Sequence, residues 1–277
     1  MGLTKQATGF SALREDFLPA CSADNVVALA GNPNAGKSTV FNALTGLRQH
    51  TGNWPGKTVL QARGHFSHRD RTFTLVDLPG TYSLQASSVE EEVARDFICF
   101  GRPDVTVVVV DATCLERNLN LVLQITETTR AVVVCLNLMD EARRKSIVLD
   151  VPLLASELGV PVVPTAARKG EGLEHLKDVI AAVATGTLRP HPTPLIYDDD
   201  IEAIAGRLAG QLQTLLRDRL PARWVALRLL EGDQALLASI ARFLDIDLSK
   251  SALKLPLPEA HIAMIRPTCT VGIEKGC

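Results

Sequence analysis

The chain has 277 residues, of which 46% are hydrophobic and 22% are charged, and its formal net charge is −2. This composition is that of an ordinary globular protein, and it argues against a global basic field that would attract nucleic acid or an anionic membrane. The longest apolar run, residues 105–112, is shorter than the roughly 18 residues that a membrane-crossing helix needs. We therefore expect a protein that is not integral to a membrane, with two domains.

The first 24 residues mix charged side chains with isolated apolar ones and lack the continuous apolar core of a secretory signal, so we expect a loose extension. From Asn25 onward, short β-rich runs alternate with helical stretches, as a mostly parallel sheet covered by helices requires. The pattern predicts an α/β domain over residues 25–186. Its six predicted strands are residues 26–30, 59–66, 72–76, 105–110, 132–136 and 161–163.

A phosphate-binding loop follows the first predicted strand. Residues 31–38 fit the pattern G-x-x-x-x-G-K-[ST] at every position and precede a helical stretch, which is the required context. In such a loop the backbone N–H groups cradle the phosphates, Lys37 reaches the β and γ oxygens, and the Ser38 hydroxyl is placed to bind Mg²⁺. We therefore predict a nucleoside triphosphate site. Its predicted contacts in this loop are Gly31, Asn32, Asn34, Ala35, Gly36, Lys37, Ser38 and Thr39.

Residues 47–59 are too rich in Gly and Pro to predict regular structure, and they place Thr58 directly before the second predicted strand. We predict that Thr58 completes the Mg²⁺ shell when GTP is bound and moves away after hydrolysis, with Gly56 beside it among the nucleotide contacts. Trp54 lies in the same stretch. The sequence leaves open whether it is a loose surface aromatic or a lid over the nucleotide.

The third predicted strand follows a polar turn at residues 68–71, which predicts one antiparallel hairpin in the sheet. It ends in Asp77-Leu78-Pro79-Gly80. This D-x-x-G pattern is weak alone, but at a strand end it places a carboxylate near Mg²⁺ and a backbone N–H near the γ-phosphate. Thr81 follows Gly80 where Ras-like enzymes carry a water-orienting glutamine, so we expect slow intrinsic hydrolysis of GTP.

Three helices are predicted between the later strands. Ser88 and Glu91 form a capping-box pattern for a helix that runs to about Phe100. Residues 115–129 and 172–184 have helical apolar spacing. The six cysteines show no C-x-x-C pair and no metal-ligand spacing, which predicts buried, reduced thiols of a cytosolic protein.

A base-reading motif, N-x-x-D, follows the predicted strand 132–136. Asp140 can accept hydrogen bonds from N1–H and the exocyclic amine of guanine, donors that adenine lacks, while Asn137 stabilises the loop. Leu138 stands where a common version of the motif has lysine. Residues 165–168 are the place for a further base-reading loop, with Ala166 and the Ala167 N–H, a candidate donor to guanine O6; the alternative is a plain connecting turn. The sequence thus favours guanine over adenine.

Because Thr81 stands in place of the water-orienting glutamine, catalysis needs another group. Two substitutes are conceivable: a backbone group of residues 52–58 that positions water, and a monovalent cation. Asn34 fits the second, because its amide oxygen is a neutral, hard ligand suited to K⁺; the alternative is a turn-stabilising asparagine. The predicted catalytic residues are Lys37, Thr58, Asn34 and Gly80. The predicted metal ligands are Ser38, Thr58 and Asp77 for Mg²⁺ and Asn34 for K⁺.

A proline-rich stretch separates the α/β domain from a second unit. It predicts a semi-rigid linker at residues 187–198, followed by an all-helical unit at residues 199–277. Asp198 or Asp199 caps a helix that reaches about Leu215. Pro221 begins a second helix, and Gly232-Asp233 ends it and caps a third.

Six segments together resemble the cytosolic amino-terminal region of the bacterial ferrous iron transport protein B family. They are G-N-P-N-A-G-K-S, G-N-W-P-G-K-T-V, D-L-P-G-T-Y-S-L, N-L-M-D, A-R-K-G-E-G and R-W-V-A-L-R-L-L-E-G-D. The resemblance implies a Ras-like G domain and a helical regulatory domain that favours GDP and tethers the G domain to a transmembrane iron permease. It also implies a place at the inner face of the bacterial inner membrane and allows for an oligomer formed through the membrane region.

The chain departs from the family in two ways. The family's membrane helices are absent from the sequence, and residues 249–277 match nothing in it, so we expect an isolated cytosolic portion or a truncated form.

Two other functions stay open. A ribosome- or RNA-associated GTPase should append a basic module, which the acidic helical unit lacks. A guanine-nucleotide switch without turnover is compatible with the missing glutamine, and an ATPase is the least favoured.

Overall fold

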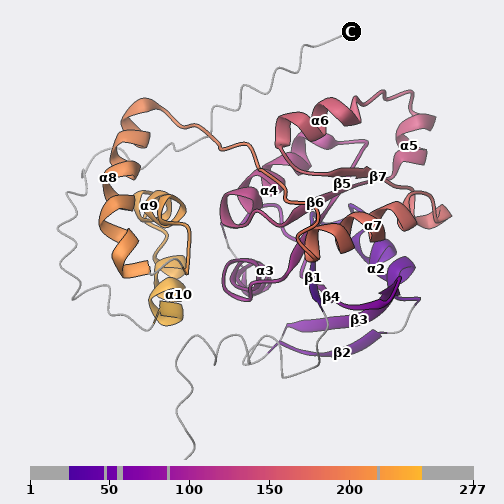
Figure 1. Ribbon diagram of the computed structural model, residues 1–277, viewed down its shortest axis with the longest axis horizontal. Helices are drawn as coiled ribbons and strands as arrows, with labels where there is room; N and C mark the ends of the chain where they lie inside the picture. The colour runs from indigo at the N-terminus through magenta and orange to yellow at the C-terminus, as the bar shows by residue number, and fades with distance from the viewer. Residues whose placement is uncertain (1–24, 47–48, 55–58, 86–87, 217–218, 245–277) are drawn as a thin grey trace, which may run out of the picture. The chain divides into compact units, whose positions relative to one another are not determined.

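The computed structural model of the protein describes residues 25–46, 49–54, 59–85, 88–216 and 219–244. Within them the chain forms two compact units, one up to Thr193 and one from Pro194 onward (Figure 1). Several predictions fall outside the described residues: the extension at residues 1–24, Gly56 and Thr58 of the nucleotide site, and the last 33 residues, 245–277.

The first unit contains a mixed sheet in the order β2-β3-β4-β1-β5-β6-β7. β1 pairs in parallel with β4 and β5, and the parallel pairing continues through β6 and β7. β2–β3 and β3–β4 are antiparallel. The bounds are β1 Asn25–Gly31, β2 Gln49–Asn53, β3 Leu60–His68, β4 Arg71–Asp77, β5 Val105–Asp111, β6 Val132–Asn137 and β7 Val162–Pro164.

The predicted hairpin of β3 and β4 is confirmed, but the prediction of six strands and of no regular structure at residues 47–59 is wrong. Gln49–Asn53 forms a seventh strand, β2, in antiparallel register with β3. An edge strand of this kind is held by backbone hydrogen bonds to a single neighbour. Its sequence, Gln-His-Thr-Gly-Asn, has no apolar alternation by which it could be predicted.

Helices cover both faces of the sheet in this unit (Figure 1). One buried cluster joins α2 and α7 to the sheet, and a second joins α3, α4 and α6 to the opposite face. β5 is buried over its first six residues and β6 over its whole length, as parallel strands between two helical layers must be. The bounds are α2 Lys37–Thr45, α3 Val89–Phe100, α4 Leu115–Thr128, α5 Met139–Arg144, α6 Val151–Leu158, η1 Ala167–Lys169 and α7 Leu173–Ala184.

The predicted starts of the longer helices are confirmed. The Ser88 side chain accepts a hydrogen bond from the Glu91 N–H at 3.2 Å and caps α3. Sequence reasoning missed α5 and α6, which have six and eight residues and are too short to show a clear apolar period. Of the cysteines in the described residues, Cys99 and Cys135 are buried as expected, but Cys114 is exposed, contrary to the prediction.

Trp54 is neither a loose surface aromatic nor a lid, so both predicted alternatives are wrong. Its side chain is only 1% exposed, and its ring meets the Phe97 ring of α3 edge to face, with centroids 5.3 Å apart. Its backbone N–H donates to Val59 O at 2.8 Å, where β3 approaches. Burial of a large aromatic ring against α3 explains this placement better than contact with a ligand.

The chain after α7 follows the surface of the first unit. The His191 N–H donates to Gly159 O at 3.0 Å, and the Thr193 N–H donates to Leu158 O at 3.1 Å. Gly159 has φ +66°, and a Cβ atom there would lie 2.0 Å from His191 O, so only glycine allows this approach. Residues 191–193 of the proline-rich stretch therefore pack on the end of α6.

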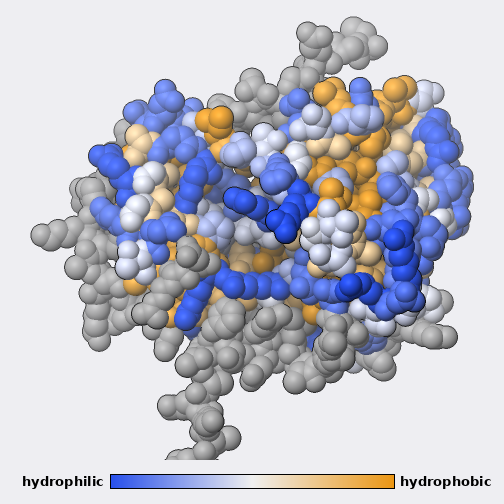
Figure 2. Space-filling view, in the orientation of Figure 1, coloured by the Kyte–Doolittle hydropathy of each residue, from blue (hydrophilic) through white to orange (hydrophobic). Residues whose placement is uncertain are grey.

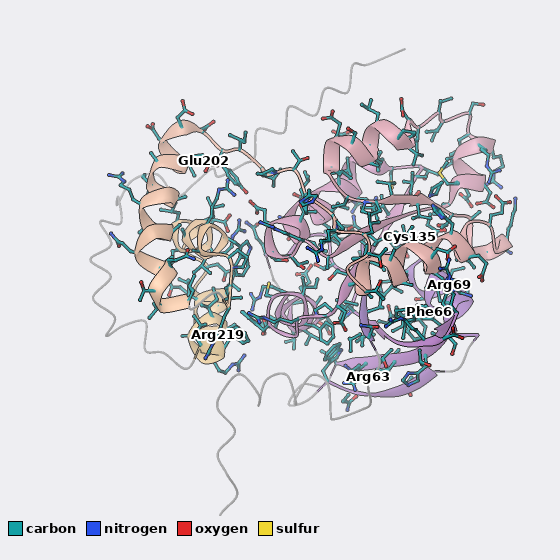
Figure 3. The ribbon with its side chains drawn as sticks, in the orientation of Figure 1. Arg63, Phe66, Arg69, Cys135, Glu202 and Arg219 are labelled. Carbon is teal, nitrogen blue, oxygen red and sulfur yellow. The ribbon has the colours of Figure 1, made fainter. Side chains whose placement is uncertain are left out.

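The second unit contains the helices α8 (Asp199–Leu216), α9 (Ala222–Glu231) and α10 (Gln234–Leu244). Pro221 precedes α9, and the Asp233 carboxylate accepts from the Leu236 N–H at 2.9 Å, as predicted for these caps. Glu202 of α8, labelled in Figure 3, pairs with Arg223 of α9 at 2.5 Å. Buried residues of all three helices form its core: Ala205, Leu208, Leu212, Leu216, Trp224, Val225, Leu227, Leu236, Ile240 and Phe243.

The surface of the first unit has an apolar area over α6 and the segment before it, which Figure 2 shows. Val148 is 94% and Leu153 is 53% exposed in this area. In the part of the chain that the structure describes, no helix is both long and apolar enough to span a bilayer.

Candidate functional site

The predicted motifs meet at one edge of the sheet. β1 ends at Gly31, β4 at Asp77 and β6 at Asn137, and these parallel strands point in the same direction. The carboxyl ends of parallel strands are where ligands bind in α/β sheets. The fold therefore brings the phosphate loop, the D-x-x-G turn and the N-x-x-D motif together.

Close approach of backbone and side chains shapes the phosphate loop. A Cβ atom on Gly31 would lie 2.6 Å from Val109 O of β5, and one on Gly36 would lie 2.4 Å from Asn137 Nδ2. Gly36, at φ +85°, precedes α2, and Asn34 adopts φ +68°, a conformation that asparagine tolerates better than most residues. Packing alone thus requires glycine at both positions of the motif.

Lys37 and Asp77 form an ion pair at the centre of the phosphate half of the site. The Lys37 Nζ lies 2.5 Å from Asp77 Oδ1, and the two side chains are 12% and 19% exposed. Burial raises the pKa of Asp77, and the nearby Lys37 ammonium lowers it less than burial raises it. A phosphate group bound by Lys37 would therefore share its ammonium with Asp77 or displace that carboxylate.

The D-x-x-G turn lies against the phosphate loop. The Leu78 N–H donates to Leu29 O at 3.0 Å, and the Thr81 N–H donates to Gly31 O at 3.3 Å. A Cβ atom on Gly80 would lie 3.3 Å from Pro33 N, which places Gly80 beside the loop.

The residue that replaces the water-orienting glutamine is buried. Thr81 is 1% exposed, and its hydroxyl donates to Ser83 O at 2.5 Å and lies 3.3 Å from a carboxylate oxygen of Glu91. Its side chain therefore faces the protein interior and is committed to internal hydrogen bonds. The expectation that Thr81 does not orient water now has a structural basis.

Asn137 connects the predicted base-reading residues 137–140 and 165–169, here called the base half of the site, to the phosphate loop. It is 1% exposed; its Nδ2 donates to Ala35 O of the phosphate loop at 3.1 Å, and its Oδ1 accepts from the Ala167 N–H at 3.1 Å. The Thr165 hydroxyl lies 3.3 Å from Asn137 Oδ1 and 3.2 Å from the sulfur of Cys135 in β6. A single buried amide thus connects β6, the phosphate loop and residues 165–167.

The structure gives the Ala167 N–H a partner other than guanine O6, which was its predicted acceptor. Because this N–H donates to Asn137, a contact with O6 would require the two acceptors to share it. Ala166 is buried, and its N–H donates to Glu171 O at 3.1 Å. Residues 165–169 therefore form an ordered turn, η1 with its flanks.

Asp140 has a charged partner that sequence reasoning missed. It lies in the first turn of α5, after Leu138 at φ +62°, and its Oδ2 is 3.3 Å from the Lys169 Nζ. Partial desolvation raises the pKa of Asp140, but the hydrogen bond and charge of Lys169 outweigh it, and the pKa lies below its ordinary value. Lys169 follows the predicted base-reading segment directly, which is the only signal for it in the sequence.

Comparison with known proteins identifies relatives of both units. Residues 25–180 match the family described as ferrous iron transport protein B, and residues 197–257 match the FeoB cytosolic helical domain. The chain is 39% identical over 257 residues to the Fe(2+) transporter FeoB of Salmonella typhimurium and 38% identical to that of Escherichia coli K12. Each match covers 89% of this chain and 32% of the relative, so the chain spans about a third of the length of these relatives.

Solved structures agree with this. The cytosolic domain of the T. maritima FeoB iron transporter in GDP form I has 37% identity and a TM-score of 0.72, with coverage of 80% of this chain and 87% of that chain. Its GMPPNP form has 38% identity, a TM-score of 0.71 and coverage of 79% and 86%. The cytosolic domain of L. pneumophila FeoB has 36% identity, a TM-score of 0.70 and coverage of 79% and 94%.

Proposed function

The chain belongs to the ferrous iron transport protein B family, and we propose that it binds GTP and GDP and hydrolyses GTP. The observation that carries this proposal is the meeting of Lys37, Asp77, Asn137 and Asp140 at one edge of the sheet. The GDP and GMPPNP forms of the T. maritima neighbour support guanine-nucleotide binding at the same kind of site.

Guanine specificity is assigned to Asp140. A carboxylate has two oxygens and several lone pairs, so Asp140 can accept from Lys169 and still accept from N1–H and the exocyclic amine of guanine. Adenine offers neither donor in that arrangement. We assign Asn137 the role of fixing the loop that presents Asp140, because its amide is already engaged with protein groups on both sides.

The donor set fits a magnesium ion. The Ser38 hydroxyl at the start of α2 and the Asp77 carboxylate at the end of β4 are hard oxygen ligands, the type that Mg²⁺ prefers, and Thr58 is the third proposed ligand. When bound, Mg²⁺ neutralises charge that develops on the β and γ oxygens. Lys37 then binds the β and γ oxygens, and the Gly80 N–H is assigned to the γ-phosphate.

Hydrolysis is proposed to be slow and to depend on K⁺. Thr81 is buried and bonded internally, so its side chain does not take the role of the Ras-like glutamine. Asn34 adopts a left-handed backbone conformation within the phosphate loop, and its exposed side chain is available to bind a cation at the β–γ bridge. Its amide oxygen is the proposed protein ligand for K⁺.

For the whole protein we propose regulation of ferrous iron uptake, with the membrane region of the transporter as partner and the inner face of the bacterial inner membrane as location. The Fe(2+) transporters that match the chain support this proposal. Membership of this family argues against a ribosome- or RNA-associated role, and so does the acidic composition of the helical unit. A nucleotide switch without turnover remains the second candidate, because Thr81 replaces the glutamine.

Two measurements test the proposed function. Competition against a fluorescent GDP analogue should show that GTP and GDP displace it and ATP does not; equal displacement by ATP would overturn guanine specificity. Single-turnover hydrolysis in KCl and in NaCl of equal ionic strength should be faster in KCl, and Asn34→Ala should remove the difference while GDP still binds. No hydrolysis in either salt would favour the switch without turnover, and equal rates would overturn potassium activation.

The helical unit is proposed to favour GDP. A chain that ends after Thr193 keeps the backbone hydrogen bonds of residues 191–193 to the end of α6. This truncation therefore removes the helical unit and leaves the contacts of the first unit in place. We expect GDP to dissociate faster from this variant than from the full chain, with a smaller change for GTP. Unchanged GDP release would show that the helices do not act on the nucleotide.

A further inference from the structure

One side of α4 carries polar residues that contact the segment after β4. Arg117, Asn120 and Gln124 are three and four positions apart, so they lie on one side of the helix. Asn120 Nδ2 donates to Tyr82 O at 3.4 Å, and Gln124 Oε1 accepts from the Leu84 N–H at 2.6 Å. The Arg117 guanidinium carbon lies 4.4 Å from the centroid of the Tyr82 ring. We call these three residues the α4 polar face and residues 78–85 the switch segment.

The switch segment and α4 both form hydrogen bonds with the phosphate loop. The Thr81 N–H, directly after Gly80, donates to Gly31 O at 3.3 Å. The Asn32 side-chain amide donates to Arg117 O at 3.4 Å. The phosphate loop, the switch segment and α4 thus contact one another pairwise, and the position of the switch segment depends on both neighbours.

The α4 polar face supplies contacts that can fix the position of a segment without regular secondary structure. The switch segment contains no helix or strand, so its backbone groups take partners from its own side chains, as Ser83 O does from Thr81, or from neighbouring elements. Leu84 is 6% exposed and belongs to the core, and Gln124 supplies the acceptor for its N–H. The Arg117 contact with the Tyr82 ring is a cation–π interaction at a partly exposed site.

We propose that the α4 polar face holds the switch segment against the phosphate loop and so sets the position of Gly80 for the γ-phosphate of GTP. The proposal rests on the proposed GTP-binding function. Arg117, Asn120 and Gln124 are positioning residues, because they act through the switch segment. GDP has no γ-phosphate, so its affinity does not depend on where Gly80 lies. Loss of a contact on this face therefore weakens the binding of the triphosphate selectively.

The test is the dissociation constant of GDP and of GMPPNP for variants of the full chain, measured by competition against a fluorescent GDP analogue. Gln124→Leu keeps the side-chain size but removes the acceptor for the Leu84 N–H. One lost hydrogen bond corresponds to GMPPNP binding that is about three- to tenfold weaker, with GDP binding changed by less than about twofold. Gln124→Glu should restore GMPPNP affinity, because its carboxylate still accepts from that N–H. Thr126→Val, which removes a side-chain hydrogen bond to Leu123 O on the opposite side of the same helix, is the matched control.

Three results would overturn the proposal: equal weakening of GDP and GMPPNP by Gln124→Leu, no change in either, or failure of Gln124→Glu to restore the affinity. A melting temperature of Gln124→Leu within a few degrees of wild type, as expected for a half-buried surface position, excludes a general loss of structure. If the wild-type chain binds no guanine nucleotide at all, the proposed function fails, and that result is distinct from the three above.

Discussion

The two halves of the site differ in how their polar side chains are held by the rest of the protein. In the base half, the buried Asn137 amide is bonded on both sides, and Asp140 has Lys169 as partner. In the phosphate half, Lys37 is paired with Asp77, so a phosphate group competes with that carboxylate for the Lys37 ammonium. A preassembled half can select its ligand at little cost in ordering, whereas a half that rearranges can report which ligand has arrived.

This difference suits a nucleotide switch. GTP and GDP share the base, so the base half should have the same structure in both states. They differ in the γ-phosphate, which is assigned to Gly80, and Gly80 lies in the irregular switch segment. Three variants test whether the two halves differ in this way.

Asp140→Asn should have the largest effect. An amide cannot accept from both guanine donors, and a polar group left unpaired on binding costs about 1–3 kcal/mol, or about 5- to 150-fold in the dissociation constant of GDP. The variant should prefer xanthosine diphosphate, whose base presents an oxygen in place of the exocyclic amine. Competition binding measures both affinities. Glu141→Gln, at the adjacent and partly exposed acid, serves as control, and an unchanged preference for GDP in Asp140→Asn would remove Asp140 from the base site.

Asn137→Ala should have the next largest effect, which we expect on the stability of the protein measured without nucleotide. It leaves the buried Ala35 carbonyl and the Ala167 N–H without their partner, so the free energy of unfolding should fall by about 1–3 kcal/mol in urea titrations. Asn137→Asp keeps an acceptor for the Ala167 N–H but places a buried carboxylate against the Ala35 carbonyl oxygen, so its stability should be no higher than that of Asn137→Ala. If apo stability is the same in all three proteins, the base half is not preassembled.

Lys169→Met should have the smallest effect. Its side chain is 57% exposed, and exposed ion pairs contribute at most about 1 kcal/mol, so we expect GDP affinity to fall by no more than about fivefold. The effect should vanish when Asp140 is already Asn, because the pair is then absent. An equal loss in both backgrounds would mean that Lys169 contacts the nucleotide by another route.

The sequence was sufficient where a local pattern determines both an element and its chemistry. The phosphate loop between a strand and a helix, the strand ends at Asp77 and Asn137, and the caps at Ser88 and Asp233 were all predicted from neighbouring residues. These features depend on short-range backbone geometry, which residue types such as glycine, serine and aspartate determine directly.

Features that depend on distant partners could not be predicted in this way. β2 exists because β3 offers it a ladder of backbone hydrogen bonds, and its own polar residues do not show this. Trp54 is buried because Phe97 of α3 packs against it. The pairing of Lys169 with Asp140 needs the turn at η1, and the pairing of Lys37 with Asp77 joins residues from two different elements. In each case the deciding contact is set by the tertiary fold.

Amide hydrogen exchange of the full chain, without nucleotide and with saturating GDP, is the strongest test of the difference between the two halves. Exchange reports local opening, so amides of a preassembled region are protected before the ligand arrives. We predict that residues 137–140 and 165–169 are protected in both samples, while residues 31–39 gain protection only with GDP. If residues 137–140 and 165–169 instead exchange freely until GDP is added, the nucleotide assembles the base half, and preassembly of that half is contradicted.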